Sequence, residues 1–250
     1  MAATGKTHSD AVVMPCRPRV AVVIPTLNEE EPIGEVIRAI PRGSVDEVIV
    51  ADSGSDDRTV ERARVAGARV IVERQRGYGR ACAAGARAAR DCGVLVFLDG
   101  DGSDRPELVP TLLEPILSGT HDFVIGTRTR GEREPGSMNA LQIVAGYVAG
   151  ALTRLLYGVA YTDMCAFRAI RREALDRLGM REMTYGWNLE MQMRAARAGL
   201  RILEVPVSHR RRRGGASKVS GTLMGTLKAG LRIGLTFARV AFERRNRESL

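Results

Sequence analysis

The sequence runs VLVFLDGDGSD from residue 94 to residue 104, and this stretch decides how the rest of the chain is interpreted. Its first five residues are apolar and prone to β structure, which predicts a buried strand over residues 94–98. The glycines that follow allow a tight turn, because they have no Cβ to clash. Asp99 and Asp101 therefore lie at the carboxyl end of the predicted strand, where open α/β sheets bind their ligands.

Asp99 and Asp101 repel each other unless a positive charge lies beside them. Hard divalent cations bind such oxygen ligands and leave room for phosphate oxygens, so the pair favours a metal-diphosphate site. A solvated turn is the alternative, because Asp and Gly are ordinary turn residues, and the stretch alone does not separate the two. An EF-hand is excluded, since Asp104 and Pro110 occupy the sixth and twelfth positions, where that loop needs Gly and Glu.

The composition is that of a globular chain with an excess of basic residues. Its 250 residues, of which 44% are hydrophobic, are enough for one large α/β domain. The formal net charge of +9 points to anionic partners such as phosphates or acidic lipid headgroups. Aromatic residues make up only 4% of the chain and no known nucleic-acid-binding motif is visible, so nucleic acid is not an expected partner.

The termini and cysteines indicate a cytoplasmic protein without a membrane span. Residues 1–18 are polar and lack the apolar core of a secretory signal, which predicts a disordered tail. The longest uninterrupted apolar stretch, residues 143–152, is shorter than the ~20 residues that a membrane span needs. No cysteine lies in a CxxC pair or at metal-ligand spacing from a histidine, which predicts reduced thiols at Cys16, Cys82, Cys92 and Cys165.

Apolar runs alternate with helical patterns along the first half of the chain. This alternation implies a parallel sheet with right-handed crossovers, hence a Rossmann-like α/β fold. The predicted strands are 19–25, 47–51, 69–73, 94–98, 123–126, 162–170 and 203–207. One predicted helix begins at Pro32, and the others cover 59–66, 80–92, 137–157 and 189–198.

Polar residues follow three of these strands. Asn28 and Glu29 come after the first strand, Asp52 after the second, and Asp99 and Asp101 after the fourth. Because the carboxyl ends of parallel strands share one edge of a sheet, we expect these side chains to meet in one crevice. That convergence favours a binding site over chance turns.

In this order, the motifs strongly resemble those of family 2 glycosyltransferases of the GT-A fold, within them the dolichyl-phosphate mannose or glucose synthase-like group. Each motif alone is weak, but their order is specific, and the similarity runs from about Val20 to Lys218. The motifs are VVIPTLNEE at 22–30, VIVADSGSDD at 48–57, DGD at 99–101, GTR at 126–128, TD at 162–163, AFR at 166–168, and R-x-x-G-x-S-K at 212–218. The resemblance implies an α/β fold with a mostly parallel central sheet flanked by helices, and a metal-dependent, inverting glycosyltransferase.

The resemblance implies a UDP- or GDP-hexose as the donor and Mg²⁺ or Mn²⁺ as the cofactor. Asp52 is suited to accept a hydrogen bond from a base N–H, with a strand-end turn as its alternative role. Ser103 stands where mannosyl synthases of this group carry a metal-binding Gln, so water is the alternative to a third protein ligand. The implied metal ligands are Asp101, Asp99 and Ser103, and the implied donor-binding residues are Pro25, Leu27, Glu29, Asp52, Asp99, Gly100, Asp101, Arg212 and Lys218.

The resemblance also implies a catalytic set of Asp101, Arg128 and Glu190. Arg128, like Arg212 and Lys218, matches a phosphate-binding basic residue of the family. Glu190 stands roughly where family 2 enzymes place a base for hydroxyl acceptors. Its alternatives are an orienting role, because a phosphate acceptor is already anionic, and a plain helix-surface carboxylate. The flanking Arg210, Arg211 and Arg213 are expected on a solvated face.

The favoured acceptor is a polyprenyl (dolichyl-type) phosphate, and a soluble or glycan hydroxyl is the alternative within the same class. A sugar-phosphate nucleotidyltransferase is more remote, because its glycine-rich loop is missing after the first strand, where residues 26–29 read TLNE. A scaffold protein without activity would have little reason to keep the carboxylate pair together with Arg212 and Lys218.

The C-terminal segment predicts an amphipathic helix. Over residues 222–242, a wide apolar surface carries a narrow basic stripe of Lys228, Arg232 and Arg239. Such a helix can lie on the cytoplasmic face of the inner membrane. The alternatives are that it packs on the domain or on a second subunit of an oligomer. The expected organisation is therefore a tail at 1–18, a GT-A domain at 19–220 and this helix within 221–250.

Overall fold

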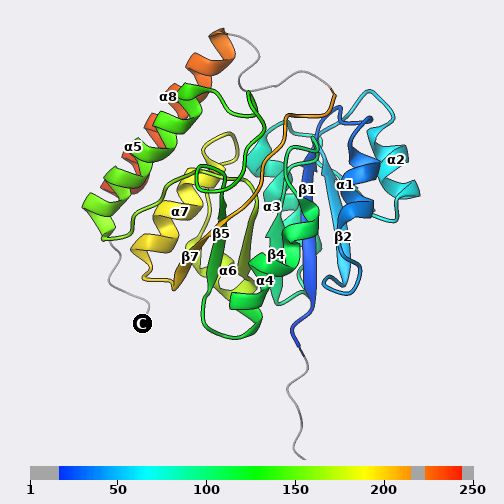
Figure 1. The fold of residues 1–250 in the computed structure, drawn as a ribbon, viewed down its shortest axis with the longest axis horizontal. Helices are drawn as coiled ribbons and strands as arrows, with labels where there is room; N and C mark the ends of the chain where they lie inside the picture. Colours follow the sequence, from blue (N-terminus) through cyan, green and yellow to red (C-terminus); the bar gives the residue numbers. More distant parts are fainter. Residues whose placement is uncertain (1–16, 215–222, 244–250) are drawn as a thin grey trace, which may run out of the picture.

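The computed structural model describes residues 17–214 and 223–243. Its centre is a seven-stranded sheet in the order β3-β2-β1-β4-β6-β5-β7, flanked by helices (Figure 1). The strands are β1 (Val20–Thr26), β2 (Glu47–Asp52), β3 (Arg69–Val72), β4 (Val94–Phe97), β5 (Phe123–Thr127), β6 (Arg168–Arg171) and β7 (Ile202–Pro206). The α-helices are α1 (Ile33–Ala39), α2 (Thr59–Val65), α3 (Tyr78–Ala88), α4 (Val109–Leu117), α5 (Ala140–Tyr157), α6 (Arg172–Leu178), α7 (Trp187–Arg197) and α8 (Leu223–Phe242).

The first half of the chain forms the parallel sheet that the sequence predicts. Strand β1 pairs in parallel with both β2 and β4, and β2 pairs in parallel with β3. Every residue of β1 and of β4 is buried, as expected for strands covered on both faces. The predicted mixed α/β class with a mostly parallel sheet is confirmed.

The second half departs from the parallel pattern at β6, which runs antiparallel to both β4 and β5. The predicted strand at 162–170 begins only at Arg168, because the preceding residues form a loop held by side chains. In that loop the main-chain N–H of Thr162 donates to Oε1 of Glu204 at 2.8 Å. Helices α4 and α6 were not predicted, and α4 carries both Pro110 and Pro115, which weaken a helical pattern.

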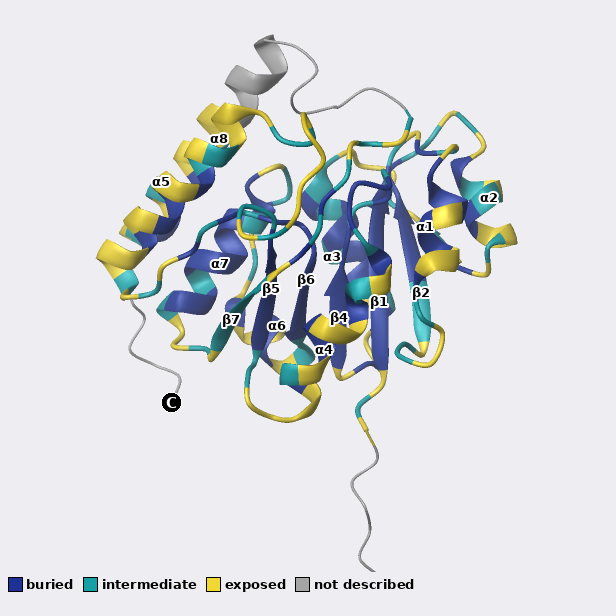
Figure 2. Cartoon of the chain, viewed as in Figure 1, coloured by how far each residue is buried: buried dark blue, intermediate teal, exposed yellow. Residues whose placement is uncertain are grey.

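Helices α5, α7 and α8 lie at one end of the sheet, where both α5 and α8 pack on α7 (Figures 1 and 2). The predicted helix at 222–242 is confirmed as α8. The three helices share a small apolar cluster of Ala149, Leu189, Met193 and Val240. Their outer side is also apolar, and the exposed large side chains are Leu141, Val144, Tyr147, Val148, Leu152, Leu155, Leu156, Leu231, Leu235 and Phe242.

Helix α5 corrects the expectation that no segment is long enough to cross a membrane. Among the described residues, this one helix meets the length and composition of a membrane span. This helix was not expected as a span because Gln142, Thr153 and Arg154 interrupt its apolar residues. Length and composition alone do not place α5 in a bilayer, since core helices of soluble proteins can have the same properties. The expected tail at residues 1–18 lies almost wholly outside the described residues, and so does Cys16, whereas Cys82, Cys92 and Cys165 are free and buried as predicted.

Gly150 of α5 gives a direct test of this packing. A Cβ at Gly150 would lie 1.7 Å from the main-chain oxygen of Tyr161, which cannot move cheaply. We expect Gly150→Ala to lower the free energy of unfolding by about 1–3 kcal/mol, measured by urea denaturation, because overpacking forces the backbone to shift. Gly234→Ala on α8 is the control, since its Cβ meets nothing within 4 Å. Equal stability of the two variants would contradict the described contact of α5 with the 158–164 loop.

Candidate active site

The carboxyl ends of β1, β2 and β4 meet at one edge of the sheet. Thr26 at the end of β1 is in register with Asp52 at the end of β2. A Cβ at Gly100, in the acidic loop (residues 99–104) after β4, would lie 2.8 Å from the Thr26 side chain. Only glycine therefore lets the acidic loop approach β1 this closely. The predicted convergence of the three strand ends is observed.

Hydrogen bonds within the acidic loop fold three carboxylates into one turn. Oδ1 of Asp101 accepts from the main-chain N–H of Ser103 at 2.9 Å and from its hydroxyl at 2.6 Å. Oδ2 of Asp104 accepts from the N–H of Asp99 at 3.0 Å. Gly102, at φ +75°, makes the left-handed turn between them. The Ser103 hydroxyl thus supports Asp101, and its role as a metal ligand stays a prediction.

Asp99 shows the electrostatic strain of this turn. Its pKa is raised to about 8, because burial disfavours the charged form and Asp104 and Asp101 add negative charge nearby. The phenol of Tyr78, in the first turn of α3, donates to Oδ1 of Asp99 at 3.1 Å and offsets part of this effect. The surroundings of the acidic loop therefore favour the protonated form of Asp99 in the absence of a cation. Sequence reasoning missed Tyr78, because no motif includes it.

The basic segment (residues 209–214) runs alongside the acidic loop. The N–H of Arg210 donates to the main-chain oxygen of Ser103 at 2.9 Å, and that of Arg213 donates to the oxygen of Asp101 at 3.0 Å. Two segments more than 100 residues apart in the chain are thus joined backbone to backbone. The bonds hold a run of arginines beside the carboxylates at the sheet edge.

Arg212 is the arginine of this segment that turns into the site. Its Nη1 lies 3.2 Å from Oδ2 of Asp101, and its Nη2 donates to Oε1 of Glu29. The guanidinium therefore bridges two of the predicted donor-binding carboxylates, which agrees with a place for Arg212 in the site. Lys218, the other basic residue of the motif, lies outside the described residues.

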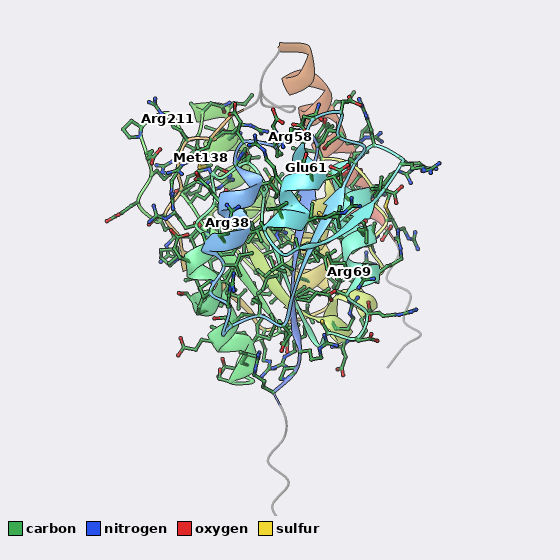
Figure 3. The ribbon with its side chains drawn as sticks, turned by 90° about the vertical axis from the view of Figure 1, so that its right-hand side faces the viewer. Arg38, Arg58, Glu61, Arg69, Met138 and Arg211 are labelled. Carbon is green, nitrogen blue, oxygen red and sulfur yellow. The ribbon has the colours of Figure 1, made fainter. Side chains whose placement is uncertain are left out.

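The flanking arginines point elsewhere, and Arg211 and Arg213 are exposed as predicted for a solvated face, whereas Arg210 is half-buried. Arg210 pairs with Glu107 at 2.7 Å, and Arg213 pairs with Glu35 at 2.7 Å. Arg211 lies at the surface against the 134–135 turn (Figure 3).

Arg128, at the end of β5, is held in a two-pronged ion pair with Asp163. Its Nε lies 2.7 Å from Oδ2 and its Nη2 lies 2.8 Å from Oδ1 of the carboxylate. Burial by itself raises the pKa of Asp163, but the hydrogen bonds from Arg128 outweigh it and the pKa lies below its ordinary value. Asp163 belongs to the TD motif at 162–163, to which the resemblance gave no role, and the structure shows that it orients Arg128. Phosphate binding by Arg128 stays a prediction.

On the nucleoside side, Asp52 is used by its own turn. Its Oδ2 accepts from the N–H of Gly54 at 2.9 Å and of Ser55 at 2.8 Å, and its Oδ1 accepts from the hydroxyl of Thr26 at 3.2 Å. This is the geometry of the strand-end turn that was the alternative reading of Asp52. Recognition of a base by Asp52, and of the donor by its neighbours Pro25 and Leu27, stays a prediction.

Glu190 is not the helix-surface carboxylate that was one of its alternatives. Its side chain is 0% exposed, because α8 covers it. Its Oε2 accepts from the N–H groups of Arg181 at 2.9 Å and Glu182 at 2.6 Å. Its Oε1 lies 3.0 Å from Nε of Arg194 and 3.1 Å from Nη2 of Arg239. Both oxygens therefore organise protein groups, a geometry that suits the orienting role better than proton abstraction.

The oxygen atoms of the acidic loop fit part of a cation site, whose other ligands would come from a diphosphate and water. Within residues 17–214 and 223–243, no group of three His, Cys, Asp or Glu side chains is arranged to hold a metal ion. Asp99 and Asp101 supply carboxylate oxygens, which hard cations such as Mg²⁺ and Mn²⁺ prefer. The donor set fits such a cation when a diphosphate and water complete its coordination.

Comparison with known proteins identifies the family. Residues 21–179 match the family model described as glycosyl transferase family 2, which covers more than half of the chain. The chain therefore belongs to glycosyl transferase family 2, and it is a glycosyltransferase. This membership removes the nucleotidyltransferase alternative.

Individual relatives share most of this chain. A dolichyl-phosphate hexose transferase of Haloferax volcanii is 38% identical over 232 residues, which cover 91% of this chain and 96% of the relative. An undecaprenyl-phosphate mannosyltransferase of Micrococcus luteus is 34% identical over 227 residues, covering 83% and 90%. Among solved structures, a complex of glucosyl-3-phosphoglycerate synthase from Mycobacterium tuberculosis with Mn²⁺, UDP and phosphoglyceric acid has a TM-score of 0.73 at 26% identity. It covers 92% of this chain and 80% of that one.

The raised pKa of Asp99 predicts a pH-dependent stability. Between about pH 4 and pH 8 the folded protein keeps a proton that the unfolded chain releases, so stability falls as pH rises through this window. Asp99→Asn removes the ionisable group and with it this loss of stability at high pH. We compare the melting temperature of the variant with that of the parent, both measured with EDTA. The difference, variant minus parent, should be more positive by roughly several degrees at about pH 9 than at about pH 5.

The control for this experiment is Asp91→Asn, which changes an exposed carboxylate in the turn after α3. Its difference from the parent should stay the same at both pH values. A difference for Asp99→Asn that is equally constant would contradict the described environment of Asp99.

Proposed function

We propose that this glycosyltransferase moves a hexose from a UDP- or GDP-sugar to a polyprenyl phosphate, with inversion at the sugar carbon and with a divalent metal at the donor diphosphate. The contact between Asp101 and Arg212 is the observation that carries the proposal, because it sets the acidic loop against the basic segment at the sheet edge. Anionic diphosphate needs both a cation and hydrogen-bond donors, and this edge offers sites for both.

The donor would lie across the ends of β1, β2 and β4. In the proposal Pro25, Leu27, Glu29 and Asp52 bind the nucleoside, Asp99 and Gly100 lie at the ribose or sugar, and Arg212 and Lys218 bind phosphate. Asp101, with Asp99 and Ser103, would hold Mg²⁺ or Mn²⁺, which when bound neutralises charge on the departing diphosphate. Solved structures of the glucosyl-3-phosphoglycerate synthase with UDP contain Mn²⁺ or Mg²⁺, which supports a cation at this place.

In the transfer step, an acceptor phosphate oxygen attacks the sugar carbon as the bond from that carbon to the diphosphate breaks. The nucleoside diphosphate leaves from the opposite side, so the configuration inverts. A phosphate acceptor is already ionised and needs no base. The buried, fully engaged carboxylate of Glu190 agrees with such an acceptor, and we infer that Glu190 orients its neighbours. The names of the two relatives described above support a polyprenyl phosphate.

A soluble or glycan hydroxyl as the acceptor is the second candidate. The synthase from Mycobacterium tuberculosis, whose structure was solved with phosphoglyceric acid, has a similar fold over 92% of this chain. A small phosphorylated acid would meet the same basic groups as a lipid phosphate, because both present a phosphate oxygen.

The outer apolar side of α5 and α8 supports contact with a lipid surface. Leu155 of α5 is 80% exposed, and Phe242 of α8 is 85% exposed. Contiguous exposed apolar side chains mark an interaction surface, and a polyprenyl acceptor gives a lipid surface a purpose. We therefore place the protein at the cytoplasmic face of the membrane, in peripheral contact through α8 and α5.

Asp101→Asn tests the donor site, because it keeps the hydrogen bonds from Ser103 and removes the charge. With UDP- and GDP-hexoses, Mn²⁺ and polyprenyl phosphate in detergent, we expect glycosyl transfer to fall by about a hundredfold or more, the usual size when one electrostatic group is lost. Binding of the matching nucleotide with Mn²⁺, followed by thermal shift, should weaken as well. Asp91→Asn is the charge-matched control. Unchanged transfer in Asp101→Asn would end the proposal, and transfer by the parent to phosphoglyceric acid alone would favour the second candidate.

The double variant Leu155→Glu/Leu235→Glu tests the membrane surface by co-sedimentation with vesicles of phosphatidylglycerol and phosphatidylcholine. We expect binding to fall by about tenfold or more, because burying each leucine contributes on the order of 1.5–3 kcal/mol. Val65→Glu is the control, since Val65 is 75% exposed on α2, at the opposite end of the sheet from α5 and α8 (Figure 2). Equal loss in Val65→Glu, or none in the double variant, would remove this surface from the proposal.

A further inference from the structure

Two buried carboxylates lie beneath α8, and one of its arginines reaches both. The side chains of Glu182 and Glu190 are 5% and 0% exposed. Nη2 of Arg239 lies 3.4 Å from Oε2 of Glu182 and 3.1 Å from Oε1 of Glu190. Glu190 has a second cation in Arg194, whereas within residues 17–214 and 223–243 the ion pair described for Glu182 is the one with Arg239.

These carboxylates fold the connecting segment (residues 180–186) between α6 and α7. Oε1 of Glu182 accepts from the N–H of Thr184 at 2.9 Å, while its Oε2 accepts from the hydroxyl of Thr236 of α8 at 3.0 Å. A Cβ at Gly186 would lie 2.4 Å from that hydroxyl, so α8 touches the segment directly. Burial raises the pKa of Glu182, but its bonds to Thr184, Thr236 and Arg239 outweigh burial and keep the pKa below its ordinary value.

The connecting segment in turn packs on the first turn of α3. The N–H of Arg80 donates to the main-chain oxygen of Met183 at 3.0 Å. A Cβ at Gly79 would lie 2.5 Å from the main-chain oxygen of Glu182, so the two backbones touch. Tyr78, in the same turn, donates to Asp99. A continuous set of contacts therefore leads from α8 to the acidic loop.

We propose that Arg239 is a positioning residue for the donor site. Through Glu182 and Glu190 it holds the connecting segment against α3, and α3 in turn holds Tyr78 on Asp99. Without Arg239, two buried carboxylates lose a shared counter-ion and repel, which loosens the segment. The inference rests on the proposed function for its donor site, but the packing it describes is tested independently.

The principal variant is Arg239→Gln, studied without lipid so that membrane contact plays no part. We expect the dissociation constant for UDP or GDP with Mn²⁺, measured by calorimetry, to rise by about tenfold, equivalent to about 1.4 kcal/mol. Arg239→Lys keeps the charge and should recover much of the affinity. In a cycle with Glu182→Gln, the two substitutions should be non-additive, because each removes the same contact.

Trp187 supplies a readout that needs no ligand. It is the single tryptophan of the chain, is 2% exposed, and its main-chain N–H donates to Thr184 of the connecting segment. In Arg239→Gln we expect its fluorescence to shift to the red and its quenching by acrylamide to rise. If the parent binds neither nucleotide, the proposed function fails while this measurement still tests the packing.

Val240→Ala is the matched control, because Val240 is the next residue of α8 and is fully buried against α7. It weakens the packing of the helix without removing an ion pair, and nucleotide affinity should stay within about twofold of the parent. Equal loss of affinity in Val240→Ala and Arg239→Gln would show that only the general stability of α8 matters. Unchanged affinity and fluorescence in Arg239→Gln would overturn the proposal outright.

Discussion

The repulsion among the carboxylates that follow β4 is the constraint on which the site depends. Asp99, Asp101 and Asp104 share one turn, and each carboxylate interacts with a different group of the protein. Asp104 accepts from the backbone of that turn, Tyr78 donates to Asp99, and Arg212 pairs with Asp101. Arg212 comes from the far end of the chain, so folding the whole sheet is necessary to place it. A site of this kind cannot form from the local turn alone.

The basic groups of the site are restrained by carboxylates as well. Arg128 is fixed by Asp163, and Arg212 is shared between Asp101 and Glu29. The antiparallel strand β6, with the loop before it, makes the first pair possible because it brings Asp163 beside the end of β5. Under the proposed function, Arg212 has two alternative partners, the carboxylates seen here and a donor phosphate. The electrostatic balance of the site would then change when the donor binds.

The sequence predicted the strand ends well because their signal is local. Continuous apolar runs mark β1, β2 and β4, and the rule that parallel strands share an edge then brings Asp52 and Asp101 together. The environment of Glu190 could not be predicted, because Arg239 follows it by almost 50 residues and periodicity says nothing of that contact. The same holds for Asp163, whose partner is set by the order of strands rather than by spacing.

Helix α8 directs two polar side chains toward the domain and leaves large apolar side chains exposed. Thr236 and Arg239 turn toward buried carboxylates, whereas Leu231, Leu235 and Phe242 remain exposed. Burying polar groups and exposing apolar ones are both unfavourable in water, unless the polar groups are paired and the apolar surface is covered. The ion pairs satisfy the first condition within the chain. Under the proposed function, a lipid surface that carries the acceptor would cover the exposed side of α8, and Arg239 would keep the connecting segment in place.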